Sequence, residues 1–216
     1  MNLDHLLQHL TPYQLKNIDR EALQELEITS IEMDSRKVIA GSLFVCLVGY
    51  QTDGHQYVQQ ALDRGAVAVV AEKPLSDCTA PMIMVPDTRR VLAFLANRFY
   101  DHPTHKLRLI GVTGTNGKTT VTHLIEKMLE DQGKKTGRIG TMNMKIDDEL
   151  FEVQNTTPES IELQKAFAKM VEKRSEYAVI EASSCDSHGQ DSREPFSCCC
   201  FYKFNAGSLG LSWYYG

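Results

Sequence analysis

A glycine-rich turn between an apolar strand and a helix constrains the fold of this chain more than any other feature. Residues 111–120 read GVTGTNGKTT and continue an apolar run. Gly114 and Gly117 permit close approach of the backbone to a ligand, and the amino end of the following helix adds about half a positive charge. The spacing therefore predicts a phosphate-binding loop, in which Lys118 reaches the outer phosphates and Thr119 places its hydroxyl on Mg²⁺.

The general phosphate-loop pattern G-x-x-x-x-G-K-[ST] is not matched in full, because Val112 stands where the first glycine is expected. A chance Gly-Lys-Thr is the competing interpretation, and the strand before the turn and the helix after it argue against chance. Glu181 supports the phosphate site, because it lies at the end of a second buried apolar strand. Nucleotide-binding folds place a carboxylate on the magnesium side at this position. Taken alone, an acidic residue at a strand end is an ordinary surface charge.

The sequence after the loop has the rhythm of a parallel α/β nucleotide-binding fold. Apolar residues at helical spacing predict a helix that Gly133 ends, and their positions are Val121, Leu124, Ile125, Met128 and Leu129. Thr157 can cap a second helix whose first position is Pro158, with apolar positions at Leu163, Phe167, Met170 and Val171. A buried strand at 177–180 follows, and this order of elements predicts a parallel sheet.

Residues 1–100 predict a separate, smaller α/β unit. Apolar runs at 43–48, 67–71 and 82–85 indicate buried strands. A short helix is expected at 55–64, and residues 91–100 have apolar side chains at helical spacing. The polar, proline-bearing segment at 101–106 then predicts a linker. We therefore expect domains at 1–101 and 107–184.

Composition excludes several classes of protein. The chain has 216 residues, of which 42% are apolar and 24% charged, as is typical of a soluble globular protein. It contains no apolar run of about 18 residues, and its first residues lack the basic region of a secretory signal. The net charge of −5, without a basic stripe, disfavours nucleic acid as a partner. We expect a monomeric cytoplasmic protein with no membrane partner.

Three stretches in the right order resemble one family. TGTNGKTT at 113–120 resembles the ATP loop of the Mur ligase family, which departs from the general pattern in the same way. DSRKVIAGSLFVCLVGYQTDGH at 34–55 is similar to the uridine-nucleotide-binding domain shared by two of its members. NTTPES at 155–160 resembles the member that adds the third residue of the peptidoglycan stem peptide. The resemblance runs from about residue 28 to Ser184.

The resemblance implies an ATP-dependent amide ligase with ATP and Mg²⁺ as cofactors. ATP would phosphorylate the side-chain carboxylate of D-Glu in UDP-N-acetylmuramoyl-L-Ala-D-Glu, and the amine of a diamino acid would attack the acyl phosphate. Residues 28–60 and 140–160 look like bacilli-type sequences, which favours meso-diaminopimelate over L-lysine. The implied fold is α/β: a small amino-terminal uridine-nucleotide-binding domain, followed by the first part of a parallel-sheet P-loop ATPase domain.

The resemblance also implies roles for individual residues. ATP would be held by Gly114, Thr115, Asn116, Gly117, Lys118, Thr119 and Thr120. Lys118 and Glu181 would be catalytic, and Thr119 and Glu181 would hold Mg²⁺. The uridine end would meet Met33 and Ser35, with residues 50–52 as further candidates, and the muramoyl-dipeptide would meet Asn155, Thr156, Thr157 and Ser184. For each Ser or Thr alone, a cap or turn hydroxyl is the ordinary interpretation.

The chain departs from the family pattern after Ser184. The family continues EASS with His-Ala-Leu, whereas here CDSHGQ follows. Residues 200–216 can be encoded so that a shifted reading frame gives VFTNLTQDHLDYHGTM, which is family-like. We therefore hypothesise that residues 185–216 are translated out of frame, which the DNA around codon 184 would test, and we expect the 216-residue product to lack ligase activity. The consecutive cysteines at 198–200 do not have the spacing of a zinc site.

The sequence alone leaves alternatives to a ligase open. A non-catalytic uridine-nucleotide-binding module with a vestigial phosphate loop is the principal one. A P-loop kinase or GTPase would leave the DSR and NTTPES stretches unexplained, and the guanine-reading N-K-x-D pattern does not occur. A folate-type ligase shares the loop, but the amino-terminal uridine domain argues against it.

Overall fold

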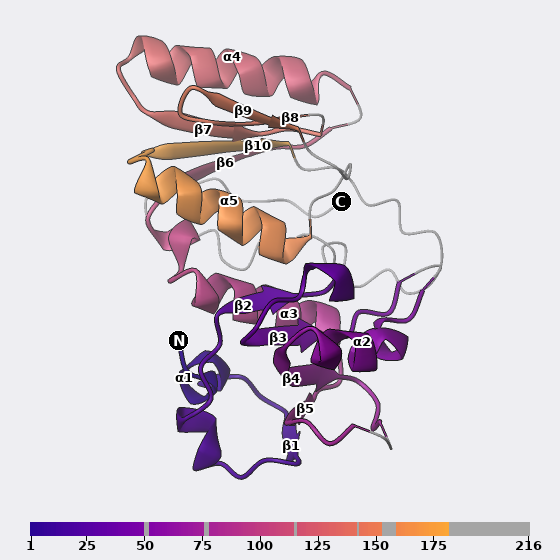
Figure 1. Ribbon diagram of the computed structural model, residues 1–216. Coiled ribbons are helices and arrows are strands. Elements are labelled where there is room, and N and C mark those ends of the chain that lie inside the picture. The colour runs from indigo at the N-terminus through magenta and orange to yellow at the C-terminus, as the bar shows by residue number, and fades with distance from the viewer. Residues whose placement is uncertain (50–51, 76–77, 115, 142, 153–158, 182–216) are drawn as a thin grey trace. The chain divides into compact units, whose positions relative to one another are not determined.

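The computed structural model describes residues 1–181 except 50–51, 76–77, 115, 142 and 153–158 (Figure 1). These described residues divide into two compact units: those up to 106 together with 159–169 form the first, and those from 107 to 152 together with 170–181 form the second. Each contains a mixed sheet with parallel strands and helices, which confirms the predicted α/β class. Within this described part, no helix is both long and apolar enough to cross a membrane.

The first unit is built on a five-stranded sheet in the order β1-β5-β4-β3-β2. Its strands are β1 (Gln14–Lys16), β2 (Ser30–Glu32), β3 (Ser42–Val45), β4 (Ala66–Ala71) and β5 (Met82–Met84). Neighbouring strands from β2 to β5 run parallel, and β1 pairs antiparallel with β5. The carboxyl ends of four strands therefore lie along one edge, which is where open α/β sheets bind ligands.

Helices enclose this sheet and explain its apolar strands. They are α1 (Leu3–Leu7), α2 (Val58–Asp63) and α3 (Thr88–Phe99), with short 3-10 turns η1 (Ala22–Gln24), η2 (Ser35–Lys37), η3 (Gly54–Tyr57) and η4 (Pro103–His105). Leu43 and Val45 of β3 belong to one buried apolar cluster, while Phe44 and Cys46 belong to another. Because both faces are covered, the strand reads as a continuous apolar run.

Two expected boundaries in this unit are corrected. The strand expected at 43–48 ends at Val45, because the chain then enters a loop that closes with a hydrogen bond from Gly54 N to Leu47 O at 2.8 Å. The helix expected at 55–64 begins as the 3-10 turn η3 and becomes α-helical only from Val58. Asp53 sets that start, since its side chain accepts from His55 N.

The second unit has a five-stranded sheet in the order β6-β10-β7-β8-β9. Its strands are β6 (Arg108–Val112), β7 (Thr136–Ile139), β8 (Asn143–Ile146), β9 (Glu149–Glu152) and β10 (Tyr177–Glu181). The strands β6, β10 and β7 run parallel, and β7, β8 and β9 form an antiparallel meander. The strands β7, β8 and β9 were not predicted from the sequence, because each spans only four residues and carries charged side chains.

Helix α4 (Lys118–Asp131) begins directly after the glycine loop and packs on β6, β7 and β10 (Figure 1). The helix is confirmed, but its expected apolar face packs only in part, through the half-buried Ile125 and Leu129. Thr122 and Glu126 are buried, whereas Val121, Leu124 and Met128 are 42%, 58% and 68% exposed. The polar face packs because Thr122 and Glu126 find charged and hydrogen-bonding partners on the strands.

Helix α5 (Ser160–Glu172) is confirmed from Ser160 onward, and its expected first positions at 157–158 lie outside the described residues. Near its carboxyl end, Met170 packs against β7. A Cβ added at Gly137 would lie 2.5 Å from the sulfur of Met170, so a larger residue there would force the end of that side chain to move. This contact leaves the opposite face of β7 to α4.

Candidate functional site

The glycine loop of the second unit has the backbone geometry that glycine alone adopts readily. Gly114 and Gly117 have φ angles of +146° and +77°, and a side chain at either position would be strained. Asn116 and Thr120 lie exposed beside them, while Thr115 falls outside the described residues. The loop therefore joins the end of β6 to the amino end of α4 through a turn that brings backbone N–H groups to the surface.

Lys118, the first residue of α4, places its ammonium at the mouth of this loop. Its Nζ donates a hydrogen bond to Gly114 O at 2.6 Å. The positive charge of the side chain thus adds to the partial positive charge at the amino end of a 14-residue helix. This combination suits a phosphate group.

Glu181 lies at the end of β10, beside the same helix end. Thr119 Oγ1 donates to Glu181 Oε2 at 3.2 Å, and Thr141 Oγ1 lies 3.4 Å from the same oxygen. Thr122 Oγ1 donates to Thr119 O at 2.9 Å and lies 3.5 Å from Glu181 Oε1. The structure therefore brings together Thr119 and Glu181, the pair predicted for Mg²⁺, although their role as ligands stays a prediction.

Three residues near Glu181 were not predicted from the sequence: Thr122, Gly140 and Thr141. A Cβ at Gly140 would lie 2.9 Å from Glu181 Oε1, so a larger residue there would force that carboxylate to move. Thr122 follows Thr119 at i,i+3, which places both hydroxyls on one helix face. This spacing is the feature of the sequence from which Thr122 could have been predicted. Hydroxyl and carboxylate oxygens are the donors that Mg²⁺ prefers. Within the described ranges, no three His, Cys, Asp or Glu side chains gather as a metal cage.

The residues predicted for the uridine end lie in the first unit, just past β2. Met33 directly follows that strand, and Ser35 begins η2, which Asp34 caps by accepting from Arg36 N at 2.9 Å. The hydroxyl of Ser35 is buried and donates to Gln60 Oε1 at 2.7 Å. Residues 50–51 lie outside the described part, and Thr52 O accepts from Gly49 N in the loop after β3.

A buried histidine ties the loop after β3 to the end of β4. His55 is 5% exposed, and its Nε2 accepts a hydrogen bond from Glu72 N at 3.1 Å. Its Nδ1 therefore carries the proton and donates to Asp53 Oδ1 at 2.5 Å. Lys73 Nζ donates to the other oxygen of Asp53 at 2.6 Å. This set of contacts was not predicted from the sequence. The feature of the sequence that could have indicated it is the Asp-Gly-His at the end of the stretch at 34–55.

Acid is expected to weaken this connection. The bond from Lys73, followed by that from His55 N, holds the pKa of Asp53 well below its ordinary value of 3.8. Because the folded pKa lies below the unfolded one, Asp53 stabilises the fold above about pH 4, and this contribution is lost as the pH falls further. Asp53→Asn should lower the free energy of unfolding by about 1 kcal/mol at pH 7.

Urea unfolding of both proteins at pH 7 and pH 3 would measure this. The difference between wild type and Asp53→Asn should shrink at pH 3. An equal difference at both pH values would show that the ionised carboxylate contributes nothing.

The other predicted residues and the cysteines divide between described and undescribed parts. Asn155, Thr156, Thr157 and Ser184 lie outside the described residues, as does the whole segment at 185–216 with its consecutive cysteines. Cys46 and Cys78, within the described part, are buried free thiols. Burial raises the pKa of Cys46 to about 12, so this thiol stays protonated and unreactive at neutral pH.

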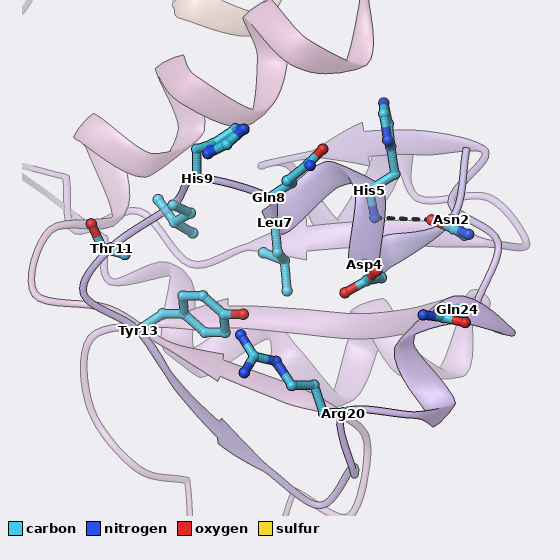
Figure 2. Close-up of a pocket in the computed structure, with 11 residues that line it drawn as sticks. Asn2, Asp4, His5, Leu7, Gln8, His9, Thr11, Tyr13, Arg20 and Gln24 are labelled. Atoms are coloured by element: carbon cyan, nitrogen blue, oxygen red, sulfur yellow. Dashed lines mark hydrogen bonds between the residues drawn. The ribbon is translucent and has the colours of Figure 1, made fainter.

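A hollow of about 490 Å³ lies beside α1 in the first unit (Figure 2). Arg20, Tyr13 and Asp4 contribute to its lining, and Asn2 caps α1 there by accepting from His5 N at 2.9 Å. Most of the lining side chains are exposed, and it contains none of the residues predicted to bind nucleotides. We assign no ligand to it.

Two protein-family models match the chain. One is described as the Mur ligase middle domain and matches residues 112–201, and the other, Mur ligase family, catalytic domain, matches residues 27–100. Together they span most of the chain and include the glycine loop and the residues proposed for uridine. The first match runs past Ser184, so the reading-frame hypothesis for residues 185–216 stays a prediction.

Curated relatives agree with these matches. The chain is 54% identical over 175 residues to the UDP-N-acetylmuramoyl-L-alanyl-D-glutamate--2,6-diaminopimelate ligase of Bacillus licheniformis, covering 81% of this chain and 36% of that protein. It is 49% identical over 199 residues to the ligase of the same name from Oceanobacillus iheyensis, covering 92% and 39%. The chain therefore spans little more than a third of the length of these relatives.

Solved structures show the same likeness. A structure titled UDP-N-acetylmuramoyl-L-alanyl-D-glutamate--2,6-diaminopimelate ligase matches with a TM-score of 0.66 and 26% identity, over 85% of this chain and 36% of that one. MurF from Thermotoga maritima, solved in complex with ADP, matches with a TM-score of 0.51 and 22% identity, over 74% and 32%. The second likeness shows the fold alone.

Proposed function

The chain belongs to the Mur ligase family, and from this premise we propose that it supplies the uridine-nucleotide and ATP sites of a peptidoglycan-precursor ligase. That ligase adds meso-diaminopimelate to UDP-N-acetylmuramoyl-L-Ala-D-Glu in the cytoplasm. One observation carries the proposal most: Lys118, Thr119 and Glu181 converge at a glycine loop where two parallel strands end. The names of the curated relatives favour diaminopimelate over L-lysine.

The chemistry needs a good leaving group, because a carboxylate oxygen leaves poorly and phosphate leaves well. An oxygen of the D-Glu carboxylate attacks the γ-phosphorus of ATP and ADP leaves; the amine then attacks the acyl carbon and phosphate leaves. Lys118 and the loop amides would orient the phosphates and neutralise charge on the moving group. Thr119 and Glu181 would hold Mg²⁺, which supplies further charge neutralisation when bound.

The first unit would hold the other substrate by its nucleotide. Met33 and Ser35, at the carboxyl edge of the sheet, are proposed to meet the uridine end, with residues 50–52 beside them. Asn155, Thr156, Thr157 and Ser184 are proposed for the muramoyl-dipeptide on the family resemblance. The contact of Ser35 with Gln60 supports this placement only by fixing the turn after β2.

A uridine-nucleotide-binding module with a vestigial phosphate loop is the second candidate. If the loop were vestigial, substitutions would be expected first at the positions that have strict structural requirements. The glycines with positive φ remain, and Lys118, Thr119 and Glu181 still meet. These features favour a working nucleotide site over a vestigial one.

Binding measurements on the 216-residue chain separate the two candidates. MgATP and UDP-N-acetylmuramoyl-L-Ala-D-Glu would each be titrated by calorimetry, and we expect both to bind. Binding of the UDP-sugar peptide alone would favour the vestigial loop. Binding of neither would refute the proposed function.

A further inference from the structure

Four charged side chains meet between α4 and the β7–β8 hairpin. Arg138 of β7 donates through Nε to Glu126 Oε2 at 2.8 Å and through Nη1 to Asn143 Oδ1 at 2.9 Å. Lys145 of β8 lies 3.2 Å from Glu126 Oε1 and donates to Glu130 Oε1 at 2.7 Å. Arg138, Glu126, Lys145 and Glu130 are called the charge quartet below.

The quartet occupies an interface where apolar side chains are the ordinary choice. Arg138 and Glu126 are only 2% and 6% exposed, and Lys145 stands directly opposite Arg138 in the antiparallel pair. Like charges in that position repel, and the two carboxylates, one helical turn apart on α4, offset the repulsion. The hydrogen bond that Lys145 donates to Glu130 raises the pKa of Lys145, which keeps its ammonium charged.

Directional bonds of the quartet join α4 to β7 and β8. Helix α4 lies along this sheet (Figure 1). Val121, Leu124 and Met128 of the helix are exposed and only Ile125 and Leu129 are half-buried, so apolar packing alone sets its rotation and its position along the strands weakly. Lys118 lies two turns before Glu126 on the same helix, roughly 12 Å along its axis. A shift of the helix at Glu126 would therefore move the ammonium and the loop as well.

Arg138 is also close to Glu181. A Cβ at Gly140 would lie 2.9 Å from Glu181 Oε1 and 3.1 Å from Arg138 Nη1. Both atoms thus lie beside the same glycine. The guanidinium charge of Arg138 is therefore near the carboxylate of Glu181, although the two groups do not form a hydrogen bond. Arg138 contacts the helix that carries Lys118 and lies beside the carboxylate that faces Thr119.

We propose that Arg138 is a positioning residue for the nucleotide site: through Glu126 it holds α4 in the one placement that aligns Lys118 and Thr119 with Glu181. This rests on the proposed function, since it names a residue that supports the same site. Arg138 does not touch the nucleotide, and it acts through the helix.

Two variants separate positioning from simple stabilisation. Arg138→Met removes the hydrogen-bonded guanidinium from the buried Glu126 and leaves it with Lys145 at 3.2 Å and the imidazole of His123 at 3.7 Å. Both stability and MgATP affinity should therefore fall, the affinity by roughly tenfold. The double variant Arg138→Met/Glu126→Met replaces the pair with apolar groups of similar size, a change that often restores stability. Calorimetric titration should show that its MgATP affinity stays low even though its melting temperature recovers.

The matched control is Lys134→Met, which breaks the exposed ion pair of Lys134 with Glu176 and should leave the affinity unchanged. If affinity and melting temperature recover together in the double variant, Arg138 is only structural and the proposal is wrong. An affinity unchanged in both Arg138 variants would also overturn it. If Arg138→Met does not fold, the double variant alone decides.

Hydrogen exchange without nucleotide separates this proposal from the function it rests on. Amides in the first turns of α4 should exchange faster in the double variant than in wild type, although global stability is similar. If wild type fails to bind MgATP, the proposed function fails, and the exchange rates still report on positioning. Unchanged exchange in the double variant would contradict the positioning role.

Discussion

Lys118→Ala is expected to weaken MgATP binding by about 100-fold, or roughly 3 kcal/mol. The ammonium donates a hydrogen bond to Gly114 O at the mouth of the loop, at 2.6 Å. Removing it takes away the charge that would oppose the outer phosphates, while the loop amides and helix end remain. Calorimetry with MgATP measures the change, and UDP-sugar binding by the first unit should stay the same.

Lys127→Ala is the matched control for this variant. Lys127 lies on the same helix, is 69% exposed and pairs with Asp131 at 2.9 Å. Its loss changes the net charge equally but removes no group near the loop, so the MgATP affinity should change little. Equal losses in the two variants would mean that general charge, and not the loop, binds the nucleotide. Wild-type affinity in Lys118→Ala would remove the central support for the ATP site.

The phosphate loop was predictable because its requirements are local. Positive φ angles require glycine at two positions of the loop, and a helix must begin at Lys118. Both requirements can be recognised in one short stretch of sequence. Glu181 was predictable for a related reason, since it ends an apolar run of strand length. The contact between Thr119 and Glu181, separated by 62 positions, could be expected only from the parallel order of β6 and β10.

The packing of α4 could not be read from the same sequence. Periodicity identified the helix, and its apolar residues would ordinarily mark the buried face. Glu126 is buried instead because Arg138 and Lys145 face it from strands too short and too charged to be recognised. The same limit applies to His55, whose partners at Asp53 and at the Glu72 amide come from two different loops.

Gly54→Ala is expected to lower the stability of the first unit by about 2–3 kcal/mol. A Cβ at this position would lie 2.8 Å from both the backbone N and O of Leu47 and 3.2 Å from the carbonyl carbon of Cys46. Gly54 N also donates to Leu47 O at 2.8 Å, so the two segments cannot separate without losing that bond. Because the contacted atoms are backbone, no side-chain rotation relieves the clash.

Hydrogen exchange and urea unfolding would locate and measure this effect. The amide of Cys46, which donates to Val70 O at 2.9 Å, reports on the β3–β4 pair beside the loop and should exchange faster in Gly54→Ala. Gln56→Ala, an exposed change in the same 3-10 turn η3, should stay within about 0.5 kcal/mol of wild type. Since the loop after β3 is proposed to meet uridine, Gly54→Ala should also weaken UDP-sugar binding while MgATP binding persists. Wild-type stability in Gly54→Ala would mean that the loop moves freely away from Leu47, and the close approach would then have no role in shaping the uridine site.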